Sequence, residues 1–354
     1  MAETIMSWQS QSWPTSPAYC NLVTLQSITG CQHLGRRWLL PGGDIESRSG
    51  SAQARLTNAS DLQSQRITAA QKELDLLTTL LACDERPISD GEARVNTTTN
   101  AQTLALAIHN ARRQRLPLGN GAPRISPENI QQAKVVQQHL IDRYIAEGHK
   151  PVGFKLGLTD VRMQAALGLD QPLASPLMAG WQIKETTLDS HELIEPRVEI
   201  EVAFVFSRPV LQPDVDDATL LSALAGVTTA FEFCDSAYAG WPHSIAEAVA
   251  DGLSFGRFML GNTLHKVDPV SLARLTAKLM NHGELVAEGA GSQCMGSPLD
   301  ACRWLVRQRA LSGTPVQAGD VLLSGALAPM LPIRAGDYLS VDMGHLGTLE
   351  CAIN

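Results

Sequence analysis

The sequence predicts an α+β fold in which helices come before a curled, mixed β-sheet or barrel-like roll. Apolar residues recur at helical spacing mainly between residues 101 and 148, whereas strand-like apolar runs dominate after residue 195. Hydrophobic residues make up 44% of the 354 residues, which is enough to form a full core. Helices on the N-terminal side and many strands later favour mixed α and β structure of this kind.

Two helices are expected first. Leu104 and Ala111 belong to an apolar stripe at helical spacing. A second helix is predicted to begin at Pro127 with Ser126 as its N-cap, because a Ser side chain accepts hydrogen bonds from the free amides of a first turn and Pro fits there. This helix is expected to end at Gly148, a residue that adopts the left-handed backbone of a helix end.

Strands and short helices follow. The clearest strand spans residues 198–206, and Ser297 is expected to cap a helix that ends by Gly313. Two shorter helices are predicted at 161–167 and 245–250. The remaining strands are predicted at 153–159, 227–233, 275–280, 284–288, 321–324, 338–342 and 348–352.

The composition divides the chain near residue 95. Residues 1–94 are rich in Ser, Gln and Thr and lack periodicity except between residues 67 and 81. We expect residues 1–94 to be a poorly structured or non-native N-terminal extension and residues 95–354 to form the folded domain.

Composition also excludes several classes of protein. The net charge of −8 argues against nucleic-acid binding, which usually needs a basic face. The best apolar run, residues 321–333, is too short for a membrane span, which needs about 20 residues. Seven cysteines without a Cys-x-x-Cys pair are typical of reduced thiols, so we expect a cytoplasmic protein. The Gly-x-Ser-x-Gly match at 252–256 follows a helical stretch, which favours a plain turn over a nucleophile elbow.

The strongest chemical signal is the pair Glu199 and Glu201. Alternate side chains of a strand share one face, so both carboxylates project the same way from an apolar strand. Two carboxylates on a buried face repel each other and call for a cation, and oxygen ligands favour Mg²⁺ or Mn²⁺. The alternative is a strand whose polar face meets solvent.

Two further charged residues interrupt apolar strands. Glu232 adds a third carboxylate, which either shares the same ion or pairs with an arginine such as Arg197 or Arg257. Lys155 is either a buried lysine whose pKa desolvation lowers, suited to proton transfer, or a surface lysine on an edge strand.

Together, several segments resemble the 2-keto-4-pentenoate hydratase / 4-oxalocrotonate decarboxylase family of the fumarylacetoacetate hydrolase superfamily. The resemblance runs in order from about residue 101 to 353. It rests on GFKLGLT at 153–159, PRVEIEVAF at 196–204, GAGSQCMGSPL at 289–299 and GALAPM at 325–330, with Glu232, Asp235, Ser236 and residues 249–251 between them.

The resemblance implies a mixed β-roll of the fumarylacetoacetate hydrolase C-terminal type with flanking helices and one divalent ion, usually Mg²⁺. Glu199, Glu201 and Glu232 stand where the family has its metal carboxylates, and Lys155 stands where it has its active-site lysine. The implied substrate is a small molecule, a 2-hydroxy-2,4-dienoate from aromatic-compound catabolism. Protonation at C5 and addition of water at C4 would give a 4-hydroxy-2-oxo acid.

The resemblance also implies a substrate site and an oligomer. The residues expected to line the substrate site are Leu173, Asp235, Ser236, Ser324 and Gly325. We expect a homo-oligomer, or a complex with an enzyme of the same pathway.

Three positions depart from the family pattern. Leu173 replaces an Asp that is typical of the hydratases, Ala237 replaces an Arg, and Gly252 replaces an Asn. An apolar residue at position 173 is closer to the decarboxylase branch, whereas residues 325–330 are like the hydratase branch. The prediction is a metal-dependent hydratase. The alternatives are a decarboxylase or related C–C lyase or hydrolase, and a non-catalytic subunit that stabilises a partner enzyme.

Family members are about as long as residues 95–354. We therefore hypothesise that translation starts at Val95, from a GTG codon. N-terminal sequencing of the native protein tests this, because an intact segment from Met1 would contradict it.

Overall fold

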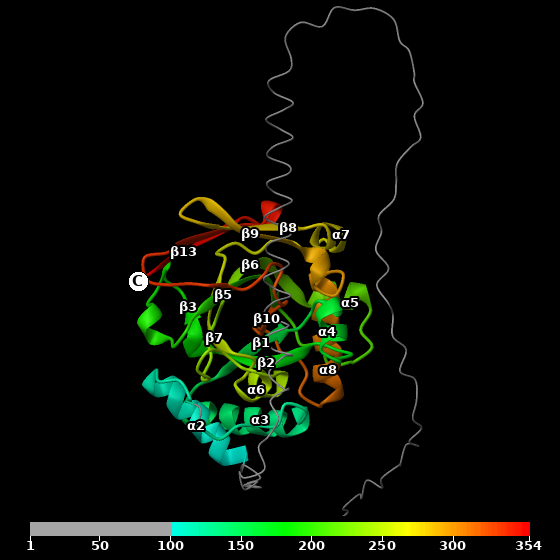
Figure 1. Ribbon diagram of the computed structural model, residues 1–354. Coiled ribbons are helices and arrows are strands. Elements are labelled where there is room, and N and C mark those ends of the chain that lie inside the picture. Colours follow the sequence, from blue (N-terminus) through cyan, green and yellow to red (C-terminus); the bar gives the residue numbers. More distant parts are fainter. Residues whose placement is uncertain (1–100, 120) are drawn as a thin grey trace, which may run out of the picture. The chain divides into compact units, whose positions relative to one another are not determined.

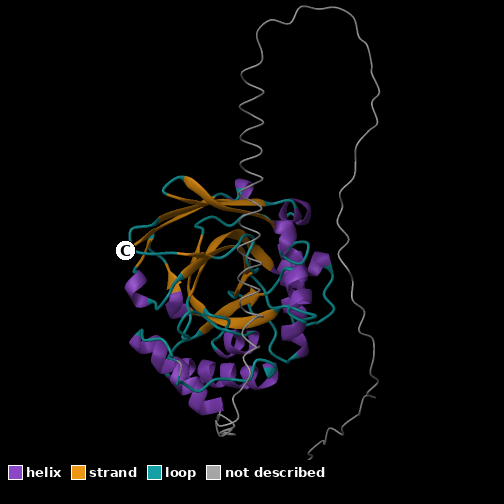
Figure 2. Ribbon diagram, in the orientation of Figure 1, coloured by secondary structure: helices purple, strands orange, loops and turns teal. Residues whose placement is uncertain are grey.

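The computed structural model describes residues 101–119 and 121–354 (Figure 1). The predicted extension at 1–94, its stretch 67–81 and the proposed start at Val95 lie outside the described residues. The described residues form helices around two sheets, as the α+β prediction requires (Figure 2).

The larger sheet has eight strands and curls round on itself (Figure 2). Its central pair, β5 (Arg197–Phe206) and β6 (Leu224–Cys234), runs antiparallel, with Glu199 opposite Glu232. The order along the sheet is β2 (Leu173–Met178), β1 (Pro151–Gly157), β10 (Val321–Leu323), β5, β6, β7 (Phe255–Leu260) and β3 (Gln182–Ile183), and β11 (Leu331–Pro332) also pairs with β5.

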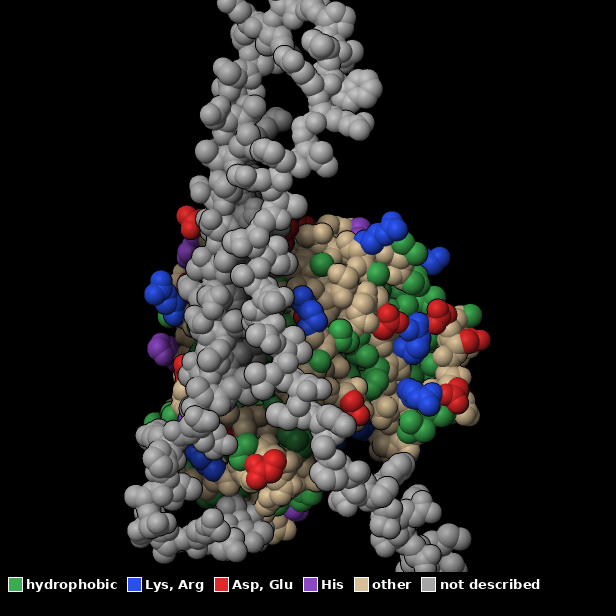
Figure 3. Space-filling model, turned by 45° about the vertical axis from the view of Figure 1, so that its right-hand side comes forward, with side chains coloured by type: hydrophobic (Ala, Val, Ile, Leu, Met, Phe, Trp, Pro, Cys, Tyr) green, Lys and Arg blue, Asp and Glu red, His purple; other side chains and the backbone are tan. Residues whose placement is uncertain are grey.

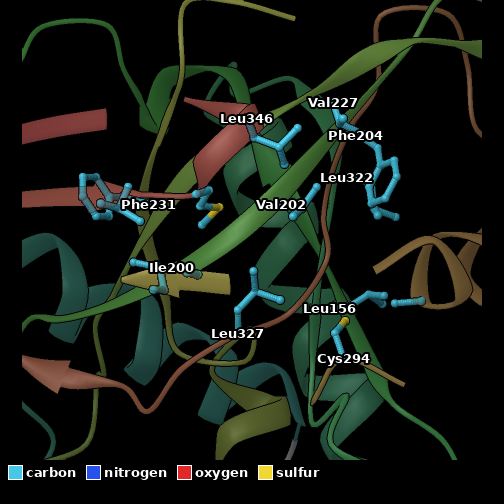
Figure 4. Close-up of a cluster of buried hydrophobic side chains, with 14 of the residues drawn as sticks. Leu156, Ile200, Val202, Phe204, Val227, Phe231, Cys294, Leu322, Leu327 and Leu346 are labelled. Carbon is cyan, nitrogen blue, oxygen red and sulfur yellow. The ribbon is translucent and has the colours of Figure 1, made fainter. Parts of the chain in front are cut away.

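A second, five-stranded sheet contributes to the main core. Apolar residues on the outer face of β5 and β6, such as Phe204 and Phe231, lie in the main core (Figure 4). Leu279 and Val341 of the second sheet belong to the same core cluster. The order of the second sheet is β4 (Thr187–Leu188), β13 (Thr348–Ile353), β12 (Tyr338–Asp342), β8 (Thr276–Asn281) and β9 (Glu284–Ala290).

Three helices lie together beside one end of the curled sheet (Figure 1). They are α2 (Ala101–Gln114), α3 (Ile130–Ala146) and α6 (Ile245–Ala250), and they share a core with Leu173, Ala237 and Leu253. The other α-helices of residues 101–119 and 121–354 are α4 (Val161–Ala166), α5 (Asp217–Ala223), α7 (Pro269–Ala273) and α8 (Pro298–Leu311), with Ser297 as the N-cap of α8 as predicted.

One helix start differs from the prediction. The helix expected at Pro127 begins at Ile130, because the side chain of Asn129 accepts the Gln132 amide and acts as the N-cap in place of Ser126. Residues 126–129 instead form a turn, closed by a hydrogen bond from the Asn129 amide to the Ser126 carbonyl.

Four strands of the larger sheet escaped prediction: the two-residue strands β3 and β11, and the longer strands β2 and β7. β2 contains Pro176, which cannot donate to a ladder, and β2 accordingly lies at the edge of the sheet. β7 contains Gly256, a weak strand former, where a Cβ would lie 2.5 Å from the Phe233 carbonyl oxygen. Close packing of neighbouring backbones therefore decides these strands, and local strand propensity does not.

The surface of the described part carries both signs of charge. On the face in Figure 3, Asp and Glu side chains lie among Lys and Arg side chains. None of the helices within the described ranges combines the length and hydropathy that crossing a bilayer requires.

Candidate active site

The three predicted carboxylates meet inside the curled sheet. Glu199 and Glu201 lie on one face of β5, and the register places Glu232 of β6 directly opposite Glu199. Glu201 and Glu232 have no exposed surface, and Glu199 is half-buried. The interpretation of a strand with a polar face towards solvent is therefore wrong.

Lys155 reaches this face from the far side of the sheet. Its strand β1 is three strands away from β6, yet its Nζ lies 2.5 Å from Glu232 Oε1 and donates to the Leu253 carbonyl oxygen at 2.9 Å. Neighbouring strands are about 4.8 Å apart, so this contact exists only because the sheet curls. Lys155 is 3% exposed, which rules out the surface lysine, and it replaces the arginine partner considered for Glu232.

Apolar residues also lie on this face. Leu323 and Phe258 are the register partners of Lys155 and Glu232, Ala203 lies two residues after Glu201, and all three are buried. Ser175 and Thr228 are buried polar neighbours on the same face. The charged groups therefore lie in surroundings of low polarity, where unpaired charge is costly.

The electrostatics of Lys155 differ from the prediction. Burial lowers the pKa of Lys155, but the charges of Glu232 and Glu199 outweigh burial and raise the pKa above its ordinary value. The expectation of a lowered lysine pKa is therefore wrong, because the carboxylates lie close enough to stabilise the ammonium.

Burial and repulsion between the carboxylates both raise the pKa values of the acids. Burial, followed by the charges of Glu232 and Glu199, raises the pKa of Glu201 well above its ordinary value. Burial also raises the pKa of Glu232 to about 7, although Lys155 opposes the shift. The single positive charge of Lys155 therefore does not compensate the negative charge of Glu199, Glu201 and Glu232.

The donor set fits a divalent cation. Glu201 Oε1 and Glu232 Oε2 are buried without a hydrogen-bond partner in the described structure, which is rare for carboxylate oxygens. Ligand atoms of Glu199, Glu232 and Cys234 lie within 4.8 Å of one another. Glu201 stands outside that group and accepts the Gly325 amide at 2.7 Å.

Cys234 of β6 is a further neighbour of the carboxylates. It is buried, and its Sγ donates towards Glu199 Oε2 and Glu232 Oε1, each at 3.4 Å. Burial and the adjacent carboxylates raise the pKa of the thiol, so the thiol keeps its proton and donates a hydrogen bond to the acids.

The side chains expected to contact substrate are engaged within the fold. The Asp235 carboxylate accepts the amides of Ile194 and Glu195, and the Ser236 hydroxyl lies 3.2 Å from Asp251 Oδ2 and accepts the Tyr238 amide. These contacts hold the segment that follows β6.

Of the three remaining candidates, Ser324 and Gly325 flank the carboxylates. The Ser324 hydroxyl accepts the Val202 amide and donates to the Gly325 carbonyl, while the Gly325 amide donates to Glu201. Leu173 is 8% exposed and shares a core cluster with Ala237 and Leu253. The two departures at 173 and 237 thus lie in one apolar cluster.

Sequence reasoning missed Arg112, in the last turn of α2. Its guanidinium donates to Asp251 Oδ1 at 2.7 Å and to the Phe255 carbonyl at 2.7 Å, both in the segment that carries Leu253. These partners lie about 140 residues away along the chain, so no local pattern marks the contact.

The geometry agrees with comparisons to known proteins. A family model described as fumarylacetoacetate (FAA) hydrolase C-terminal matches residues 182–354. A 2-keto-4-pentenoate hydratase 1 from Dechloromonas aromatica is 35% identical over 219 residues, which cover 62% of this chain and 83% of the relative. This chain belongs to the 2-keto-4-pentenoate hydratase / 4-oxalocrotonate decarboxylase family of the fumarylacetoacetate hydrolase superfamily.

Two further relatives support the family. A 2-hydroxyhexa-2,4-dienoate hydratase from Comamonas testosteroni is 32% identical over 260 residues, 72% of this chain and 96% of that protein. The structure of a 4-oxalocrotonate decarboxylase from Pseudomonas putida G7, complexed with magnesium and adipate, is 28% identical. It superimposes with a TM-score of 0.65 over 72% of this chain and 97% of its own.

Proposed function

We propose that this protein is a divalent-metal-dependent hydro-lyase that adds water to a 2-hydroxy-2,4-dienoate and forms a 4-hydroxy-2-oxo acid in aromatic-compound catabolism. The observation that carries the proposal is the cluster of buried Glu201 and Glu232 and half-buried Glu199 beside Lys155, in which two carboxylate oxygens lack partners in the described structure. Relatives named as hydratases of this substrate class support it.

Glu199, Glu201 and Glu232 would hold the cation, and their hard oxygen ligands favour Mg²⁺ or Mn²⁺. When bound, the ion supplies Lewis acidity to the carboxylate and 2-oxygen of the substrate. Glu201 is fixed for this role by the Gly325 amide, which leaves its other oxygen free for a ligand.

Lys155 holds a proton at Nζ on the same face. Glu232 and the Leu253 carbonyl fix the ammonium from two directions, so its remaining N–H group has a defined orientation. We propose that Lys155 positions the substrate or relays the proton to C5. The buried residues Leu323, Ala203 and Phe258 exclude water from the inner face.

Glu199→Gln tests the site directly. We expect the variant to lose Mg²⁺ binding, measured by calorimetry, and to lose turnover of 2-hydroxypenta-2,4-dienoate by roughly 100-fold or more. Glu284→Gln, at an exposed position of β9, is the matched control and should change neither. Full turnover by Glu199→Gln in the presence of a chelator would contradict the metal-dependent mechanism.

A second candidate is decarboxylation. Leu173 lies in an apolar cluster with Ala237 where family hydratases carry an acid and an arginine, and the superimposable decarboxylase supports this alternative. A substrate panel separates the two. Hydration of 2-hydroxypenta-2,4-dienoate is expected, whereas release of CO₂ from 4-oxalocrotonate without hydration would replace the hydratase proposal. Absence of both activities would favour a non-catalytic subunit.

We propose further that the protein acts in the cytoplasm as a homo-oligomer or in a complex with an enzyme of its pathway. The four cysteines within the described residues are free and buried, which suits a reducing compartment. Light scattering after size-exclusion chromatography measures the oligomer, and a monomeric mass would contradict this part of the proposal.

A further inference from the structure

A strained turn lies between α6 and β7. Gly252, Leu253 and Ser254 have φ angles of +68°, +57° and +54°, so three consecutive residues are left-handed. Glycine adopts this conformation freely, but Leu and Ser do so only at a cost in free energy. Such a turn persists only where surrounding contacts hold it, and strain of this kind gathers at functional sites.

The turn presents its backbone to the active site. The Leu253 carbonyl accepts Lys155 Nζ at 2.9 Å, and the Ser254 carbonyl accepts the Asp235 amide at 2.7 Å. Just before the turn, Asp251 Oδ2 accepts the Ala237 amide at 2.9 Å. The turn therefore connects Lys155 to the segment that follows Glu232.

Arg112 of α2 holds both ends of this turn. Its Nη2 donates to the Asp251 carbonyl at 3.2 Å and to the Asp235 carbonyl at 2.9 Å, in addition to the bonds from Nε to Asp251 Oδ1 and from Nη1 to the Phe255 carbonyl. The side chain is 13% exposed, and the Asp251 side chain has no exposed surface. A planar guanidinium can make these four bonds at once, whereas a lysine ammonium has only three donors.

We propose that Arg112 is a positioning residue for Lys155. By closing residues 251–255 into the left-handed turn, it fixes the Leu253 carbonyl that orients the lysine Nζ. Helix α2, which precedes the residues that the family model matches, thus contributes to the geometry of the site in the curled sheet. The role in turnover rests on the proposed hydratase function, while the hold on the turn does not.

Arg112→Lys keeps the charge and removes the fork. We expect kcat to fall by roughly tenfold or more, with KM and Mg²⁺ affinity within about twofold of wild type, because the lysine loses its orientation while the ligands remain. Hydrogen exchange should speed up at the amides of residues 235 and 252–255 in the protein without substrate.

Arg124→Ala is the matched control. Arg124 also joins the N-terminal region to α6, through a 2.7 Å ion pair with the buried Glu247, but it makes no bond to the turn. This variant should lower Tm, leave kcat within about twofold of wild type and leave exchange in the turn unchanged.

Relief of strain provides the second arm. Ser254→Gly added to Arg112→Lys should restore kcat at least about threefold, because glycine adopts the left-handed conformation without the hydrogen bonds of Arg112. The proposal is overturned if Arg112→Lys leaves kcat and exchange unchanged, or if Arg124→Ala lowers kcat equally. A wild-type protein with no turnover overturns the proposed function alone, because the exchange measurement still tests the turn.

Discussion

At the scale of single residues, the site is defined by too much negative charge in too little space. Lys155 offsets part of the charge of Glu232, but among the described residues the only hydrogen-bond partner of Glu201 is the Gly325 amide. Because burial raises the pKa of both acids, the folded protein binds protons more tightly than the unfolded chain does. The same charge that attracts a cation therefore opposes folding when no cation compensates it.

Stability without divalent metal should fall with rising pH. The contribution of Glu232 is fully present below its unfolded pKa of 4.5 and is lost as the pH rises through the folded value of about 7. Tm measured in chelator is therefore expected to decrease between pH 5 and 8, and saturating Mg²⁺ should reduce the decrease. A metal-free Tm that rises over this range would contradict the pKa directions.

Glu201→Gln separates folding from binding. The amide cannot ionise and so avoids the free-energy cost of burying this acid, whose pKa the fold raises. Tm in chelator at pH 8 is therefore expected to rise, while Mg²⁺ affinity is expected to fall roughly 10- to 100-fold. Thermal unfolding and calorimetry measure the two effects on one sample. A variant that binds Mg²⁺ like wild type would remove Glu201 from the proposed ligands.

At the scale of elements, the segment after β10 holds the carboxylates in place. Gly325 has a φ of +97°, and a Cβ there would lie 2.4 Å from Thr159 Oγ1. Its amide nevertheless reaches Glu201, so glycine is required both for the backbone conformation and for the space. The backbone conformation at Gly325 thus directly determines the position of Glu201, a proposed metal ligand.

Gly325→Ala should destabilise the protein by about 3 kcal/mol or more and weaken Mg²⁺ binding, since strain and a steric clash act together. Gly319→Ala is the control, because Gly319 has a φ of +90° with no heavy atom within 4 Å of its Cβ position. It should cost about 1 kcal/mol and leave binding unchanged. Equal losses for both variants would show that strain alone matters.

At the scale of the whole molecule, the described residues contain both sheets, the helices α2, α3 and α6, and all the candidate site residues. The relatives match 62–72% of this chain with 83–96% of their own length. We therefore propose that residues 95–354 form the complete catalytic unit.

A chain that starts with Met at position 95 should retain turnover within about twofold and show the same Tm as the full chain. Parallel purification, with the assay and the thermal scan run side by side, measures both quantities. A truncated chain that folds but loses turnover would give residues 1–94 a role in the site.

The sequence by itself determined strands such as β5 and the acids on them. Alternation along β5 placed Glu199 and Glu201 on one face, and cap residues such as Ser297 marked helix starts, because these signals depend on neighbours within a few residues. The resemblance then named the family, which the relatives support.

Only the tertiary structure decided which groups meet. Curling of the sheet brings Lys155 across three strands to Glu232, and that contact reverses the expected direction of the lysine pKa. Packing of α2 against the end of the curled sheet brings Arg112 to a turn about 140 residues away along the chain. The physical reason is that a buried charge is controlled by whatever surrounds it in three dimensions, and local sequence does not encode those surroundings.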